Sequence, residues 1–175
     1  MNKVKVIFAL VVIAISINSF TAKPKEAINW IDFTELANLH KTNPRPIIID
    51  VYTNWCGWCK VMDQKTYTNE KLASYINEKY YAVKFDAESK EEIIFDGKTY
   101  YYDNKNKIHQ LALYLTYGRL EFPHTVLLEA PNSQPAPISG YLKPAQLEMP
   151  IKFFVEKANE DQTFVEFNKA AKKEW

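Results

Sequence analysis

The sequence contains little of what would specify a metal centre, a disulfide framework or a nucleic-acid-binding surface. It has two cysteines and three histidines among its 175 residues. Its 22 basic and 21 acidic residues leave a net charge of +1, which gives no reason to expect nucleic acid or an anionic membrane surface as partner. No internal repeat, long linker or block of like charge divides the chain. With 47% hydrophobic residues, the composition is that of one folded domain with a sizeable core.

A closed zinc site is poorly supported, because such a site needs about four protein ligands. Beside the cysteines, only His40, His109 and His124 are available, and no pair of them has ligand spacing. His109 lies off the apolar stripe of its predicted helix, so we expect it at the surface. Metal binding by the two cysteines remains an alternative, since C-x-x-C is also half of a metal site.

The two cysteines stand in the segment Trp55-Cys56-Gly57-Trp58-Cys59-Lys60. The apolar run 47–52 before it predicts a buried strand, and residues 61–65 after it predict a helix. The helix N-terminus, with its unpaired N–H groups and partial positive charge, favours a thiolate. A disulfide stabilises a fold mainly through the loop it closes, and this one would close almost none. The pair is therefore interpreted as redox-active rather than structural.

Residues 1–22 are typical of a secretory signal peptide rather than of the fold. Lys3 and Lys5 precede an apolar run from Val6 to Ile17, which is too short for an ordinary membrane span. Ala22 would end the segment, although Phe20 stands where a small residue is preferred, so an uncleaved anchor is the alternative. Export would place the cysteines in an oxidising compartment.

The rest of the chain alternates predicted strands and helices. A possible edge strand at 27–31 is followed by a helix to His40, and the cysteine helix by a second helix capped by Thr68 or Asn69. After a strand at 81–85, Asp96-Gly97 predicts the turn of a hairpin. Ile108, Leu111, Ala112 and Leu115 predict an amphipathic helix. The end of the chain predicts strands at 125–128 and 138–141, a helix around Leu147–Val155, and a tail helix packing through Phe164, Val165 and Phe167.

This order of elements around C-x-x-C resembles the thioredoxin superfamily, and more narrowly the exported bacterial thioredoxin-like proteins with a C-x-W-C site. The similarity covers most of residues 27–158. It is carried by Asp50 six residues before Cys56, the cysteine segment, Pro123 opening a strand, and Gly140. The resemblance implies an α/β thioredoxin-like domain at 23–175, with a central mixed sheet flanked by helices. A hairpin insertion before the proline strand and an extra C-terminal helix would be additions.

The resemblance also implies roles for individual residues. Cys56 would be the exposed nucleophile and Cys59 the buried resolving thiol. Asp50 would be a buried proton shuttle with a raised pKa, the alternative being a satisfied acid at a strand end. Lys84 would pair with Asp50, or else be a solvated strand lysine. Pro123 would be a cis-proline that brings the Phe122 backbone beside the sulfurs, ready to pair with an extended substrate.

Substrate contacts are expected from Trp55, Trp58, Phe122, Pro123 and His124. His124 would either touch Cys56 or point outward. The expected function is an exported, periplasmic thiol–disulfide oxidoreductase that reduces protein disulfides, with no cofactor beyond its own disulfide and with a membrane or exported electron donor. The alternatives are an oxidase or isomerase of secreted proteins and a non-enzymatic metal-binding or chaperone module.

Overall fold

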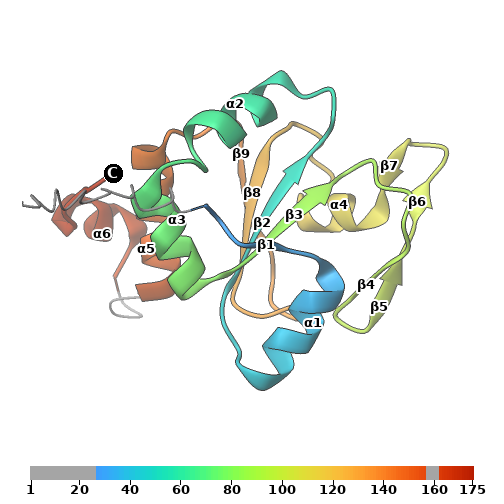
Figure 1. The fold of residues 1–175 in the computed structure, drawn as a ribbon, viewed down its shortest axis with the longest axis horizontal. Helices are drawn as coiled ribbons and strands as arrows, with labels where there is room; N and C mark the ends of the chain where they lie inside the picture. Colours follow the sequence, from blue (N-terminus) through green and yellow to red (C-terminus); the bar gives the residue numbers. More distant parts are fainter. Residues whose placement is uncertain (1–26, 157–161) are drawn as a thin grey trace, which may run out of the picture.

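The computed structural model describes residues 27–156 and 162–175, so the predicted signal segment 1–22 lies outside the described residues. The chain folds around one five-stranded sheet with helices on both faces (Figure 1). In chain order the elements are β1 (Trp30–Ile31), α1 (Phe33–Thr42), β2 (Ile47–Tyr52), α2 (Gly57–Lys65), α3 (Glu70–Lys79), β3 (Tyr81–Asp86), β4 (Ile93–Phe95), β5 (Lys98–Tyr100), β6 (Tyr102–Asp103), β7 (Ile108–His109), α4 (Gln110–Leu115), β8 (His124–Leu128), β9 (Ala136–Ser139), α5 (Pro144–Glu156) and α6 (Phe164–Ala170).

The sheet has the order β1-β3-β2-β8-β9. The strands β1, β3 and β2 are parallel to one another, β8 runs antiparallel to β2, and β9 runs antiparallel to β8. One face packs on α1 and α4 through Leu36, Leu111 and Leu115. The other packs on α2, α3 and α5, which contribute Met62, Ile76 and Leu147. The predicted mixed α/β architecture is therefore confirmed.

The central strand β2 is buried on both faces, which explains its nearly continuous apolar sequence. Ile49 and Val51 belong to the core on the α1 and α4 side, while Ile48 belongs to the core beneath α2. Because side chains alternate along a strand, Asp50 shares the face of Ile48. The one acidic residue of the central strand thus faces the helix that carries the cysteines.

The residues between β3 and β8 form the predicted insertion. The hairpin β4–β5 turns at Asp96 and Gly97, whose φ values of 51° and 68° suit a two-residue turn with both residues left-handed. A second ribbon, β6–β7, then leads into α4. The helix predicted to include Ile108 begins at Gln110 instead, because Ile108 and His109 pair with β6.

His109 is fully buried, so its expected place at the surface is wrong. Its Nδ1 accepts from the N–H of Leu111 and caps α4, and its Nε2 therefore donates to the carbonyl oxygen of Glu91. The helical spacing of apolar residues led to the wrong prediction, because a residue that caps a helix can be buried without belonging to the apolar stripe of that helix.

The predicted C-terminal helix is α6, and its Phe164 and Phe167 pack on Phe153. Val165 is 58% exposed, so its predicted packing role is wrong. The final residues fold back onto α5, where the fully buried Glu148 accepts from the N–H groups of Glu174 and Trp175. Within residues 27–156 and 162–175, none of the helices has the length and apolar character needed to cross a bilayer.

Candidate active site

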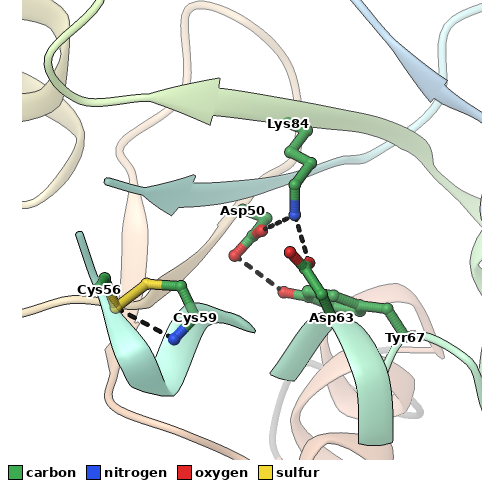
Figure 2. Close-up of a disulfide and its surroundings, with 6 residues drawn as sticks. All are labelled: Asp50, Cys56, Cys59, Asp63, Tyr67 and Lys84. Carbon is green, nitrogen blue, oxygen red and sulfur yellow. Dashed lines mark hydrogen bonds and ion pairs between the residues drawn. A yellow bond between two sulfur atoms is a disulfide. The ribbon is translucent and has the colours of Figure 1, made fainter. Parts of the chain in front are cut away.

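Cys56 and Cys59 form a disulfide at the start of α2 (Figure 2). Cys56 is the N-cap residue, and the N–H of Cys59 donates to its Sγ at 3.0 Å. This places one sulfur at the end of the helix where terminal N–H groups and the helix dipole favour negative charge. The predicted strand-to-helix position of the pair is confirmed. No group of three or more potential metal ligands occurs in the described part of the chain.

The two sulfur-bearing residues do not differ in exposure in this disulfide form, since each is 4% exposed. The expectation that Cys56 would be open and Cys59 shielded is thus not met before reduction. Trp55 directly precedes Cys56 and Trp58 directly precedes Cys59, and they are 66% and 62% exposed. The surface next to the disulfide is therefore formed by indole rings rather than by sulfur.

A carboxylate–lysine cluster lies between the cysteine helix α2 and the strands β2 and β3 (Figure 2). Asp50 is 2% exposed, and its Oδ2 lies 2.8 Å from Nζ of Lys84 on β3. Lys84 also forms an ion pair with Asp63 of α2, and the Tyr67 hydroxyl donates to Oδ1 of Asp50 at 3.2 Å. The expected Asp50–Lys84 pair is therefore present, and each oxygen of the Asp50 carboxylate accepts a hydrogen bond.

Within this cluster, the pKa values of Asp50 and Lys84 are both raised. Burial raises the pKa of Asp50, although the Lys84 ammonium opposes this effect and the Asp63 carboxylate adds to it. Burial acts to lower the pKa of Lys84, but Asp50 and Asp63 outweigh it and the net pKa is raised. A buried carboxyl group with a raised pKa is suited to accept and return a proton, which is the role that the resemblance implied for Asp50.

The Phe122–Pro123 peptide bond is cis, as expected from the resemblance. It opens β8 next to the carboxyl end of β2, since Val51 pairs with His124. The Phe122 ring meets the Trp55 ring edge-on at 6.1 Å between centroids. This contact places the proline segment against the cysteine loop, where the substrate was expected to bind.

His124 is buried, so the outward position, one of the two expected for it, is wrong. It is 1% exposed, so it does not point outward, and neither ring nitrogen has a hydrogen-bond partner in the described residues, so it does not bond to Cys56. Strand alternation explains the result: Thr125 pairs with Asp50 and faces α2, whereas His124 shares the opposite face with Val126. Burial lowers the pKa of His124. Direct contact between His124 and a substrate is therefore not supported.

The chain has relatives among proteins of known sequence. The family model described as "Protein of unknown function, DUF255", or Thioredox_DsbH, matches residues 17–155. The chain belongs to this family. Among curated proteins, it is 26% identical over 118 residues to the uncharacterized protein B0495.5 of Caenorhabditis elegans, covering 67% of this chain and 14% of that protein. It is 25% identical over 100 residues to human spermatogenesis-associated protein 20, covering 57% of this chain and 11% of that protein.

Solved structures place the DUF255 chain in the thioredoxin fold. A structure described as "DsbH Oxidoreductase" superposes with a TM-score of 0.54 at 17% identity, covering 79% of this chain and 93% of the other. A thioredoxin-fold protein from Helicobacter pylori superposes with a TM-score of 0.54 at 19% identity, covering 73% and 80%. At these identities the likeness establishes the fold alone. The predicted membership of the thioredoxin superfamily is confirmed.

Several site residues of the DUF255 chain were not predicted from its sequence. Asp63 and Tyr67 join Asp50 and Lys84, and Tyr141 stacks on Trp58 with centroids 5.5 Å apart. The available signal was helical spacing, because Cys59, Asp63 and Tyr67 recur every four residues and so lie near one face of α2 and its extension. No comparable signal marked Tyr141, which reaches the site from beyond the end of β9.

Proposed function

We propose that this DUF255 chain is an exported thiol–disulfide oxidoreductase that reduces disulfide bonds in other proteins. The observation that carries the proposal is the Cys56–Cys59 disulfide at the N-terminus of α2, above the buried Asp50–Lys84 pair. A disulfide between residues only three positions apart contributes little to stability, so its placement near a buried carboxyl group favours a chemical role.

The reaction is a balanced exchange of one disulfide for another. In the reduced protein, the Cys56 thiolate attacks one sulfur of the substrate disulfide, and the other substrate sulfur leaves and takes up a proton. Asp50 then accepts the proton of Cys59, whose thiolate attacks Sγ of Cys56 and releases the second substrate thiol. Two electrons pass from the Cys56–Cys59 pair to the substrate, and the Cys56–Cys59 disulfide is restored.

The residue types around the cysteines favour the direction in which the substrate is reduced. Trp58, between them, carries no charge that would stabilise the Cys56 thiolate, and a less stabilised thiolate makes a better reductant. Asp50 is available to drive the resolving step. The name of one protein with a similar fold, "DsbH Oxidoreductase", agrees with the reaction class. We propose no cofactor beyond the disulfide itself.

We further propose that the protein is exported and that it acts with two kinds of partner. The basic and apolar pattern of residues 1–22 favours secretion to the periplasm or, if uncleaved, anchoring to the membrane. In an oxidising compartment the pair needs a dithiol donor to be reduced again, so a membrane-bound or exported electron donor is proposed as the second partner, beside protein disulfide substrates.

Insulin reduction by the purified protein tests the function, with Cys56→Ser as the inactive control. We expect turnover in the presence of a dithiol donor, and a reduction potential in glutathione equilibrium well below about −120 mV, the value of strong periplasmic oxidants. A potential near that value, with efficient refolding of a scrambled disulfide protein, would instead support the oxidase or isomerase alternative. A tightly held metal and no disulfide reduction would support the metal-binding alternative.

A further inference from the structure

Glu88 connects the insertion to the cysteine loop. It lies just after β3, at the start of the insertion, and its Oε1 accepts from Nε1 of Trp55 at 3.0 Å. Next to this contact, Nδ2 of Asn54, one residue before Trp55, donates to Oδ2 of Asp86, two residues before Glu88, at 2.8 Å. The two residues before Cys56 are therefore both held by side chains of the segment 86–88.

The backbone that carries Glu88 is itself fixed. Ala87 is fully buried, its N–H donates to the carbonyl oxygen of Tyr52 at 2.8 Å, and its carbonyl oxygen accepts from the N–H of His109 at 2.7 Å. Oδ1 of Asp86 accepts from the N–H of Glu88 at 2.9 Å. Glu88 is thus anchored both to the central strand and to the far end of the insertion, where His109 caps α4.

Trp55 is held from two sides and yet remains available to a ligand. Glu88 binds its indole N–H, and the Phe122 ring meets its ring edge-on. Despite both contacts the residue is 66% exposed. A large apolar surface held in one orientation binds more tightly than the same surface on a mobile side chain, because less side-chain entropy is lost on binding.

We infer that Glu88 is a specificity-determining positioning residue, which holds Trp55 as a rigid apolar wall for polypeptide substrates. The inference rests on the proposed function. The substrates it selects are protein disulfides with a bulky apolar side chain beside the reacting cysteine, since that side chain would lie on the exposed indole face. Trp58, two residues after Cys56 and stacked on Tyr141, is exposed as well. A polypeptide substrate can therefore contact apolar side chains that a small disulfide does not need.

The test compares Glu88→Ala, Glu88→Gln and Glu92→Ala in the full-length protein, with insulin and with oxidised glutathione as substrates. Glu88→Ala should raise KM for insulin about three- to tenfold, because Trp55 becomes free to rotate, while kcat and the rate with oxidised glutathione change less than twofold. Glu88→Gln should recover most of the wild-type KM, because its amide oxygen still accepts from the indole N–H. Glu92 is an exposed acid of the same insertion whose side chain forms no hydrogen bond or ion pair with the described residues, so Glu92→Ala controls for the loss of charge.

A double-mutant cycle with Trp55→Phe isolates the contact, since phenylalanine keeps a ring but has no N–H. In that background Glu88→Ala should produce no further rise in KM. The indole N–H resonance of Trp55, identified by its loss in Trp55→Phe, should shift in Glu88→Ala and return in Glu88→Gln. Equal KM values for wild type and Glu88→Ala, or equal effects of Glu88→Ala and Glu92→Ala, would overturn the inference while leaving the proposed function intact. Failure of the wild type to reduce insulin would instead contradict the proposed function.

Discussion

Nζ of Lys84 lies 2.8 Å from Oδ2 of Asp50, and the two residues stand directly opposite each other on the neighbouring parallel strands β3 and β2. The pairing is therefore built into the register of the sheet and does not depend on a loop. Asp63 approaches the same ammonium group from α2, so Lys84 is shared between a fully buried carboxyl group and one that is 41% exposed. This arrangement links the buried acid to the solvent-facing side of the cysteine helix.

Replacing Cys59 by serine should trap the reaction at the mixed disulfide. Cys56 can still attack a substrate, but no thiolate is left to release it. We expect reductant-sensitive covalent adducts to accumulate in Cys59→Ser and to be scarce in Cys56→Ser, as seen on non-reducing gels. In the reduced wild type, an alkylating reagent should modify Cys56 much faster than Cys59. Adducts formed mainly through Cys59 would reverse the assigned roles.

Replacing Asp50 by asparagine should slow turnover at neutral pH by about one to two orders of magnitude, because the resolving step loses its proton acceptor. Stopped-flow measurement of the release of substrate from the mixed disulfide checks this step directly. The same substitution should not destabilise the fold at neutral pH. Turnover equal to that of the wild type would return Asp50 to a purely structural role.

The pH dependence of stability gives a second measurement on Asp50. Its pKa in the folded protein is raised above its ordinary value of 3.8, mainly by burial. The folded state therefore keeps the proton more tightly than the unfolded state, so the contribution of Asp50 to stability is greatest below 3.8 and is lost as pH rises through the folded pKa. Chemical unfolding should show Asp50→Asn gaining stability relative to the wild type across that window, with the two converging in acid.

Replacing Asp63 by asparagine should lower the pKa of Asp50, because the Asp63 carboxylate contributes to raising it and competes for Lys84. The midpoint of the Asp50-dependent limb of the pH–rate profile should move to lower pH. Turnover at neutral pH should fall by less than about threefold, since the buried acid itself remains. Glu92→Gln serves as a control for removing an exposed charge. A midpoint that does not move would contradict the coupling through Lys84.

Replacing Glu148 by alanine should destabilise the protein by about 3–5 kcal/mol, the usual cost of breaking a buried ion pair from one side. Glu148 is fully buried, pairs with Lys152 at 2.9 Å, and also accepts from two backbone N–H groups of the chain end. Urea unfolding measures the loss. The control is Glu174→Ala, whose 51%-exposed carboxylate lies 3.4 Å from the same lysine and should contribute less than about 1 kcal/mol. Similar losses in the two variants would refute this account.

The parts of the site that follow from local sequence were predicted well. The strand before Cys56, the helix after it, and the hairpin turn at Asp96-Gly97 each depend on a few neighbouring residues. The resemblance to the thioredoxin superfamily added the predicted roles of Asp50 and Pro123.

The interactions that depend on three-dimensional placement could not be predicted in the same way. Whether Asp63 reaches Lys84 depends on how α2 is rotated over the sheet, and the two residues lie 21 positions apart. The surface position expected for His109 and the outward alternative for His124 were wrong, because a helix cap or the alternation of a strand can bury a polar side chain. The role of Glu148 was not predicted. This residue stands between two core residues of α5, Leu147 and Met149, and no sequence pattern indicates that its carboxylate accepts from the backbone near residue 174.

The two outer strands of the central sheet also affect how this protein would coexist with its substrates. In the described part of the chain, β1 contributes only two residues to its edge, and the four-residue β9 includes Pro137, which has no N–H to donate. Edges this short or proline-bearing are poor templates for intermolecular strand addition. A reductase of unfolded, disulfide-linked polypeptides would bind aggregation-prone chains at every turnover. The short and proline-bearing edges of this sheet would disfavour the addition of strands from those chains.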